Sequence, residues 1–296
     1  MALTLAEAAK LSNDLLLAGV IESLIKESPV LQVLPFIEIV GNGLTYNREN
    51  AAPTAAFYSV GDTWAESTPT FTQITTALTI LGGDADVDNY LKATRSNVQD
   101  LEAAVVELKA KALRDKFEDT FINGDTSVDA KAFDGLDKLT ISGQTVSMGT
   151  NGATLSLDKL DELIDAVKGG KPHMLLMSRR SRRKMGALSR ATGSGLLETD
   201  RNEFGMMVQY YDGIPIGVND YVSDAKTVGT STDCSTLHAL QFGEGATVGL
   251  SGPGGLQVER VGSLEAKDAT RTRVKWYVSI ALFNTLKLSK LTGVRD

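Results

Sequence analysis

The sequence predicts an α+β fold with an extended outline, and three stretches carry this prediction. Residues 95–124 repeat apolar side chains at alternating spacings of three and four, which is typical of one long amphipathic helix. Residues 41–90 contain two strand-like runs separated by a small, polar, turn-rich stretch, which indicates a long two-stranded arm. The run 271–282 alternates apolar and polar residues, which is typical of a strand with one buried face.

Composition limits the class of protein. The 296 residues, 42% of them hydrophobic, can bury a sizeable core and form two domains. The net charge of −7 at pH 7 argues against a protein that coats nucleic acid. A single cysteine, Cys234, excludes an internal disulfide framework and favours a reducing cytoplasm. No apolar run approaches the ~20 residues that cross a bilayer, and the N-terminus lacks a signal peptide pattern, so no membrane partner is expected.

The N-terminal segment, residues 1–28, has the apolar spacing of a helix with a face too broad for a free tail. We expect it to dock either on its own domain or, as an arm, on a neighbouring chain. Because proline disfavours a helical conformation for the residue before it, the helix is predicted to end at Ser28. Val30–Val40 is predicted to be extended, with a break at Pro35.

The arm follows the turn at residues 41–43. Leu44–Asn50 is predicted as one strand and Phe71–Leu81 as the other, and residues 51–69 form the loop tip. Ile74, Leu78 and Ile80 are predicted to share one face. Because an isolated two-stranded ribbon is marginally stable in water, the arm requires a partner surface within the subunit or outside it.

The arm tip contains Trp64, flanked by Asp62 and Glu66. A large aromatic side chain on a loop of small residues is common at interface anchors. Trp64 either folds back on its own hairpin or is covered by a neighbouring chain, and these three residues are candidates for an assembly interface.

Three aspartates, Asp84, Asp86 and Asp88, resemble the start of a calcium-binding loop. The pattern then fails, since Asn89 stands where glycine is needed and Arg95 where the bidentate glutamate should be. We predict a solvated acidic turn here and no metal site.

The long helix is predicted over 95–124 and ends at Asn123-Gly124. At about 1.5 Å per residue it would be roughly 40 Å long, either packed on a sheet or acting as a strut between separate parts of the subunit. The residues of the predicted buried stripe are Val98, Leu101, Val105, Leu108, Ala112, Phe117 and Phe121.

A basic helix follows a short buried strand in the middle of the chain. After a helix capped by Ser156, Met174–Met177 is predicted as the strand and Ser178 as the cap of the next helix. This helix contains Arg179, Arg180, Arg182, Arg183 and Lys184, mostly opposite its apolar face. A solvated face or ion pairs with a neighbouring chain are favoured over phosphate binding, since no aromatic residues interleave the arginines.

The remaining strands are predicted around the turn Asp212-Gly213 and at Leu237–Phe242, Leu256–Val261 and Arg271–Leu282. In the last strand Val274, Trp276 and Val278 share a face that we expect against the long helix. Arg271 and Arg273 lie on the opposite face, which is usable for other contacts.

Residues for catalysis are scarce. His173 and His238 are the two histidines, no G-x-S-x-G elbow occurs, and Gly252–Gly255 lacks the Lys and Ser/Thr of a phosphate-binding loop. We predict no catalytic, cofactor-binding or metal-binding residues, and therefore not an enzyme.

Five segments in order resemble the major capsid proteins of tailed bacteriophages, which have the Hong Kong 97-like fold. They are FINGD and FDGL after the long helix, PHMLLMSRRSRRKMGAL, YYDGIPIGVND, and RVKWYVSIALFNTLKLSKLTGV. The resemblance covers nearly the whole chain. It implies an N-terminal arm and the strand that follows it at 1–40, an extended loop at 41–93, a peripheral domain at 94–124 plus 253–296, and an axial domain at 125–252.

The resemblance also implies a function. The expected protein is a structural subunit that assembles into hexamers and pentamers of an icosahedral head, which encloses double-stranded DNA in the virion after assembly in the host cytoplasm. Expected partners are further copies of the chain, a separate scaffolding protein, a portal and a decoration protein, with the DNA contacted non-specifically. The alternative is a shell of the encapsulin type, which packages protein cargo. Arg179, Arg180, Arg182, Arg183, Arg271 and Arg273 join Asp62, Trp64 and Glu66 as candidate interface residues.

The sequence departs from the family pattern at the extended loop. Some members weld their shells through a lysine on this loop, and residues 43–91 contain none. We therefore expect no covalent cross-link through the loop. Because the sequence enters the arm directly from Met1, a separate scaffolding protein is expected.

Overall fold

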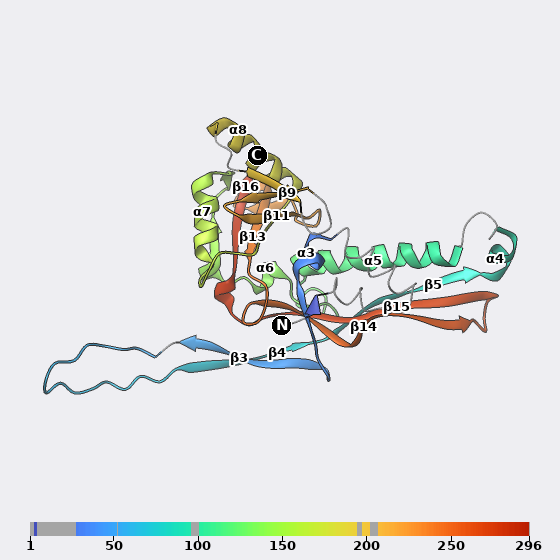
Figure 1. The fold of residues 1–296 in the computed structure, drawn as a ribbon, viewed down its shortest axis with the longest axis horizontal. Coiled ribbons are helices and arrows are strands. Elements are labelled where there is room, and N and C mark those ends of the chain that lie inside the picture. Colours follow the sequence, from blue (N-terminus) through green and yellow to red (C-terminus); the bar gives the residue numbers. More distant parts are fainter. Residues whose placement is uncertain are drawn as a thin grey trace.

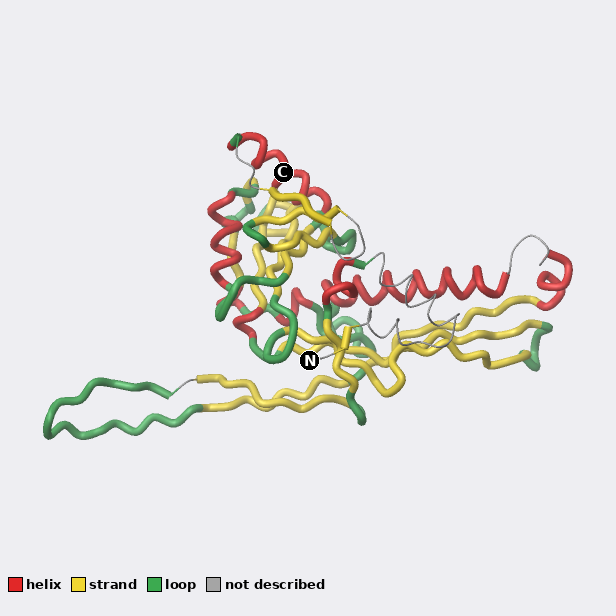
Figure 2. Tube along the Cα trace, viewed as in Figure 1, coloured by secondary structure: helices red, strands yellow, loops and turns green. Residues whose placement is uncertain are grey.

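The computed structural model describes residues 3–4, 28–51, 53–95, 101–193, 197–201 and 207–295. It consists of two sheet-based units and an arm that projects far beyond both of them (Figures 1 and 2). The predicted N-terminal helix lies outside the described residues, as do Val98 and the segment 96–100. No helix among the described residues is long and apolar enough to cross a membrane.

The first unit is a five-stranded sheet in the order β1-β2-β14-β15-β5, covered on one face by the long helix α5. The strands are β1 (Leu3–Thr4), β2 (Pro35–Glu38), β5 (Thr79–Asp88), β14 (Thr247–Ser263) and β15 (Ala269–Leu282), and the helices are α3 (Pro29–Val33), α4 (Asn89–Arg95) and α5 (Leu101–Asn123). Strands β14, β15 and β5 form an antiparallel ribbon that runs beneath α5 in Figure 1. The prediction that the closing strand packs on the long helix is confirmed.

Aromatic side chains hold α5 to this sheet. The ring centroids of Phe117 and Trp276 lie 5.2 Å apart, and those of Phe36 and Trp276 lie 5.3 Å apart. Trp276 also donates a hydrogen bond from Nε1 to Ser251 Oγ at 3.2 Å, so the polar atom of this buried ring is satisfied. This cluster determines which face of α5 is buried against the sheet.

The predicted stripe of α5 is wrong at Leu108 and Ala112, whereas Val105 packs against the core as predicted. Leu108 is 66% exposed, whereas Val106, Ala110 and Leu113 are buried against the sheet. At 3.6 residues per turn, nine residues separate Leu108 from Phe117 by about 180°, so the two side chains cannot share a face. Ala112 is likewise exposed. Helix α4 is described over Asn89–Arg95 and α5 from Leu101, so the predicted course of the helix through 96–100 lies outside the described residues.

Two further local predictions for this unit are corrected. Pro29–Val33 is helical and not extended, because Ser28 Oγ accepts a hydrogen bond from the Leu31 N–H and proline occupies the first helical turn. The strand predicted over Leu256–Val261 is longer, because β14 begins at Thr247 and includes the glycine-rich residues, with a break in register between Ser251 and Leu256. Gly249 is needed there because a Cβ at this position would lie 2.4 Å from the Phe36 ring.

The arm is a two-stranded ribbon of β3 (Gly43–Ala51) and β4 (Thr70–Ala77), as predicted. Ile80 does not continue the face of Ile74 and Leu78, since it is 78% exposed. The reason is that the chain leaves the ribbon at Leu78 and enters β5, where Ile80 pairs with Tyr277 of the first sheet.

The second unit is a nine-stranded mixed sheet with the main order β6-β16-β13-β8-β11-β10-β9. The strands are β6 (Thr145–Ser147), β7 (Ala153–Thr154), β8 (Met174–Met177), β9 (Leu197–Arg201), β10 (Met207–Tyr211), β11 (Ile214–Val218), β12 (Lys226–Val228), β13 (Ser231–Leu240) and β16 (Leu288–Arg295). The helices are α6 (Leu136–Leu139), α7 (Leu157–Ala166) and α8 (Arg179–Thr192), with 3₁₀ turns at Ser142–Gln144 and Thr285–Lys287.

Several predictions for this unit are confirmed. Ser156 and Ser178 cap α7 and α8, β8 is buried throughout, and Asp212 and Gly213 have positive φ angles of 49° and 74° in the turn between β10 and β11. Positive φ at both central residues is the requirement of a type I′ hairpin turn.

The strand pairing groups the C-terminal residues differently from the expected division of the chain. The resemblance implies that residues 288–295 belong with the long helix, whereas β16 pairs with β13 and β6 inside the nine-stranded sheet. Residues 247–252 belong to β14 of the five-stranded sheet and not to the other unit. The chain therefore crosses between the two units once more than the sequence indicated, after Leu282.

Glu118 of α5 is buried where this helix meets the nine-stranded unit. It is 5% exposed, and its Oε2 accepts a hydrogen bond from Asn219 Nδ2 at 3.0 Å. Burial raises the pKa of this carboxyl, and Ser28 and Arg114 offset only part of that effect. The ionised carboxylate is therefore less favourable in the folded chain than in the unfolded chain.

Replacement of this residue, Glu118→Gln, is expected to stabilise the subunit at pH 8 by on the order of 1 kcal/mol. The amide has nearly the shape of the carboxylate, without the cost of burying its charge. A raised pKa in the folded state means that this cost is present above that pKa and disappears as pH falls toward the unfolded value of 4.5. Urea unfolding of both proteins across this pH range should show their free-energy difference shrinking. A variant less stable than the wild type at pH 8 would show that attraction to Arg114 outweighs burial.

Candidate assembly surfaces

The arm is fixed to the subunit at its root. Tyr46 of β3 donates a hydrogen bond from its hydroxyl to the Leu282 carbonyl at 3.0 Å, and its ring meets Phe283 edge-on at a centroid distance of 4.8 Å. Arg48 Nε donates to the Phe283 carbonyl at 3.2 Å. These contacts were not predicted, because no local pattern shows that β3 lies beside the C-terminal end of β15 and Phe283.

The tip of the arm exposes large apolar side chains. Phe57 and Val60 are fully exposed, and Trp64 is 78% exposed. Trp64 stacks on Tyr58 at a centroid distance of 4.4 Å, so it contacts its own hairpin and still presents its other surface to solvent. The sequence analysis did not name Phe57 or Val60 as candidates, although both are large apolar residues on the same loop as Trp64.

The two acidic candidates at the tip differ. Asp62 Oδ2 accepts a hydrogen bond from the Ser59 N–H at 2.6 Å and so closes the turn at the end of the loop. Glu66 is exposed. The tip is thus internally shaped by Asp62 and by the Tyr58–Trp64 stack.

The arginines of α8 are divided between two roles. Arg179 forms a bidentate ion pair with Asp220, with distances of 2.5 Å from Nε to Oδ1 and 2.7 Å from Nη2 to Oδ2. Arg182 and Arg183 are exposed. The prediction that the arginines lie mostly opposite the apolar face is confirmed for these three, with Met185 buried on the other side.

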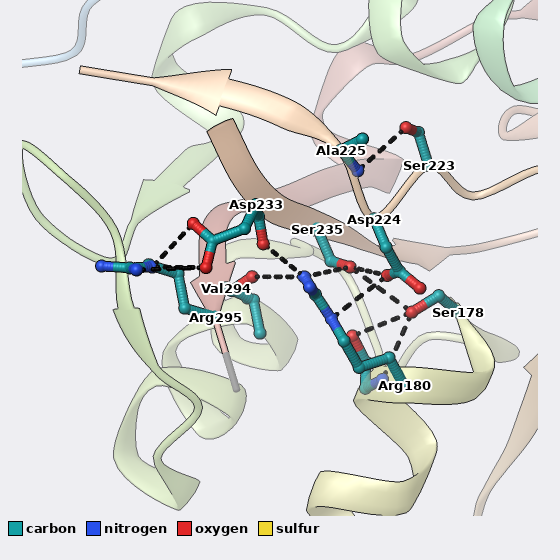
Figure 3. Close-up of polar contacts among 10 residues, drawn as sticks. Ser178, Arg180, Ser223, Asp224, Ala225, Asp233, Ser235, Val294 and Arg295 are labelled. Atoms are coloured by element: carbon teal, nitrogen blue, oxygen red, sulfur yellow. Dashed lines mark hydrogen bonds and ion pairs between the residues drawn. The ribbon is translucent and has the colours of Figure 1, made fainter. Parts of the chain in front are cut away.

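Arg180 instead points into its own subunit (Figure 3). Its Nη2 donates to the carbonyls of Asp233 and Val294 at 2.6 and 3.3 Å and to Ser235 Oγ at 3.1 Å. Its Nε lies 3.5 Å from Asp224 Oδ1, and the side chain is 17% exposed. Arg180 therefore joins α8 to β13 and to the end of β16, and it differs from the exposed arginines with which the sequence grouped it.

The acidic run 84–88 is a strand and not a solvated turn, which corrects the prediction. Asp84 and Asp86 lie opposite Arg273 and Arg271, and each pair is bidentate with distances between 2.6 and 2.9 Å. The hydrogen bond from Arg273 is the main cause that lowers the pKa of Asp84. Exposed pairs of this kind contribute little to folding stability but keep this face electrically balanced. Within the described residues, no cluster of three or more His, Cys, Asp or Glu side chains could hold a metal ion.

The two histidines lie in different environments. His238 is fully buried, and its Nε2 lies 3.5 Å from Asp137 Oδ1. Burial lowers the pKa of this histidine to about 4. His173 is exposed, and its Nδ1 accepts a hydrogen bond from the Phe242 N–H at 3.1 Å. A buried, neutral histidine is poorly placed to exchange protons with a substrate in solvent. Contact of any of the nine candidate residues with a neighbouring subunit stays a prediction.

Comparisons with known proteins agree with this fold. The chain is similar to the holo-SrpI encapsulin of Synechococcus elongatus PCC 7942, with 20% identity, a TM-score of 0.71 and coverage of 99% of this chain and 96% of that one. It is similar to the capsid of a native GTA particle, with 14% identity, a TM-score of 0.65 and coverage of 92% and 91%. It is also similar to a chain in a solved structure of Microbacterium phage Oxtober96, with 16% identity, a TM-score of 0.66 and coverage of 91% of both chains.

These structural likenesses show the fold, which is the predicted Hong Kong 97-like type. A search of curated proteins finds no match. The family model described as Phage capsid family matches residues 11–289, which is nearly the whole chain. The chain therefore belongs to the phage capsid family and is a major capsid protein, a structural subunit of the virion.

Proposed function

We propose that the protein forms an icosahedral phage head from hexamers and pentamers and that this head encloses double-stranded DNA. The observation that carries the proposal is the arm. Its root is fixed to the subunit by Tyr46 and Arg48, whereas its tip presents Phe57, Val60 and Trp64 to solvent. An apolar tip held this far from its own core is suited to burial on another copy of the chain.

The arrangement supports a structural role rather than catalysis. The side chains described at the candidate surfaces form ion pairs, caps and packing contacts, and the buried histidine is held neutral. We infer that the subunit has no enzymatic activity. The family supports self-assembly. A separate scaffolding protein, a portal, a decoration protein and assembly in the host cytoplasm are proposed as its further partners and setting.

The contents of purified particles test the packaging part of the proposal. Particles from infected or induced cells are expected to have a nuclease-resistant content of DNA and an absorbance spectrum dominated by nucleic acid. The control is the protein expressed alone, whose particles are expected to lack packaged phage DNA. Particles that contain one abundant folded protein and no DNA would instead assign the chain to the encapsulin type of shell.

A further inference from the structure

Helix α8 presents a basic face on which two arginines, Arg182 and Arg190, are exposed to solvent. Positions 179, 182, 183, 186 and 190 share this face at 3.6 residues per turn. Arg182 and Arg190 are exposed and form no ion pair with the described residues. Arg179 is already held by Asp220. The face is therefore cationic, and α8 itself lies at the top of the unit in Figure 1.

Gly186 lies at the centre of this face. Glycine in a helix interior costs about 1 kcal/mol relative to alanine. A Cβ at Gly186 would lie 3.5 Å from Arg190 Nη1, which is an ordinary contact, so packing within the subunit does not require glycine here. A glycine surrounded by arginines allows the backbone of another molecule to approach the helix closely.

An acidic pocket lies elsewhere on the same unit, between α7 and the β9–β10 hairpin. It has a volume of about 420 Å³ and is lined by Asp161, Ile164, Asp165, Glu198, Tyr211 and Asp212. Asp161 accepts a hydrogen bond from the Tyr211 hydroxyl at 2.7 Å, and Asp212 pairs with Lys171 at 2.5 Å. Asp165 and Glu198 form no ion pair with any described residue, so the pocket retains negative charge.

We propose that the acidic pocket of one subunit receives the basic face of α8 of the next subunit around a capsomer. This inference rests on the proposed function and names the surfaces that close its rings. The two surfaces are different patches of one chain, which is the requirement of a head-to-tail contact that generates a ring. Opposite charges at the two patches favour the correct partner and oppose contact between two identical patches.

A second copy fits this helix better than DNA. The face has no aromatic side chains on which bases could stack, and the chain as a whole has a net charge of −7. The pocket offers carboxylates together with the apolar side chain of Ile164 and the ring of Tyr211, which suits the long aliphatic stem of an arginine. Binding of DNA by α8 is the competing outcome of the experiment.

Charge reversal on each surface tests the pairing. The first variant is Arg182→Glu/Arg190→Glu, the second is Asp165→Lys/Glu198→Lys, and the third combines all four substitutions. The matched control, Glu244→Lys/Asp129→Lys, changes the same number of charges on exposed turns. Shell yield is measured by sedimentation at about 0.1 M salt, where charges still interact over ~10 Å. Melting of the unassembled subunit is measured in parallel.

Each of the first two variants is expected to lower shell yield by about tenfold or more, because like charges then face each other. The combined variant is expected to restore assembly, since the pair is present with its signs exchanged, and the control is expected to assemble normally. Normal yield from either of the first two variants would overturn the pairing. Failure of the combined variant to recover, with an unchanged melting temperature, would overturn it too. Shells that form at normal yield but contain no DNA would also overturn the pairing, because they would indicate that α8 binds DNA. A wild-type chain that forms no shells would instead count against the proposed function itself.

Gly186→Met gives a test that changes no charge. Methionine favours a helix more than glycine does, so the free subunit is expected to melt at the same or a higher temperature. Its side chain would occupy the space into which the neighbour approaches, so shell yield is expected to fall. Normal shells from this variant would show that nothing approaches α8 closely.

Discussion

Removal of the arm tip is expected to give a folded subunit that forms no shells. Residues 52–69 would be replaced by Asn-Gly, because Ala51 and Thr70 are paired in the ribbon and a two-residue type I′ turn joins such a pair. The tip is exposed and its hydrogen bonds are local, such as Ser59 N–H to Asp62 and Ala65 N–H to the Tyr58 hydroxyl. Its loss should therefore change the free energy of unfolding by less than about 1 kcal/mol.

Assembly should respond very differently from folding. Each subunit would lose a whole contact patch that contains Phe57, Val60 and Trp64, and every 1.4 kcal/mol lost from an interface weakens it about tenfold. Thermal melting and electron microscopy on the same preparation give both readouts. The variant Phe57→Asp/Val60→Asp keeps the loop length and is expected to behave like the deletion, whereas Ser67→Ala is expected to assemble normally. Normal shells from the shortened arm would reject its role, and an unfolded subunit would place the tip in the folding core.

The second large effect is a contrast between two leucines on α5. Leu113→Asp is expected to destabilise the subunit by several kcal/mol, because it places an unpaired carboxylate in the apolar contact with the sheet. Leu108→Asp makes the same chemical change at a position that is 66% exposed, and it is expected to alter stability by no more than about 0.5 kcal/mol. Soluble yield and urea unfolding of the unassembled subunits would measure the difference.

The same contrast reports on the orientation of the helix. Equal stability of the two variants would show that α5 does not present Leu113 to the sheet. Leu108→Asp as the more damaging change would indicate that the helix is rotated by about half a turn, as the sequence first suggested.

The case of α5 illustrates what a periodic pattern can and cannot predict. The existence and end of the helix followed from spacing and from Asn123-Gly124. Its orientation did not, because alanine, valine and leucine occupy both sides of the segment 103–113. The buried side is set by Phe117, Phe121 and Trp276, and counting backwards from Phe117 in steps of four and three gives Leu113, Ala110 and Val106. The buried side of the helix could therefore be predicted from the sequence, but only by counting positions backwards from the aromatic residues.

Long-range pairing was the main feature that local patterns could not give. Leu288–Arg295 forms strand β16, yet nothing local in its sequence shows that the chain crosses to the nine-stranded sheet after Leu282. Likewise, Asp84 and Asp86 looked like a solvated turn, because their partners Arg271 and Arg273 are nearly two hundred residues away and meet them only through strand pairing.

The sequence predicted the conformation of the arm tip and of the basic helix, but not the contacts of each side chain. Trp64 stands out as the one tryptophan in a loop of small residues, and the structure shows that Phe57 and Val60 of the same loop are exposed as well. Arg180 was grouped with its neighbours, although the helical turn directs it to Asp233 and Val294. The acidic pocket was missed because its residues come from α7, β9 and the turn after β10, which only the fold brings together.

Electron microscopy of the purified protein tests the central claim most directly. The protein would be concentrated at neutral pH over a range of salt, with and without lysate that contains its scaffolding protein. Closed shells of uniform diameter, with pentamers at the vertices and arms lying across neighbouring subunits, are the expected result. A species that stays monomeric under every one of these conditions, although folded by its melting curve, would contradict the assignment of this chain as a self-assembling capsid subunit.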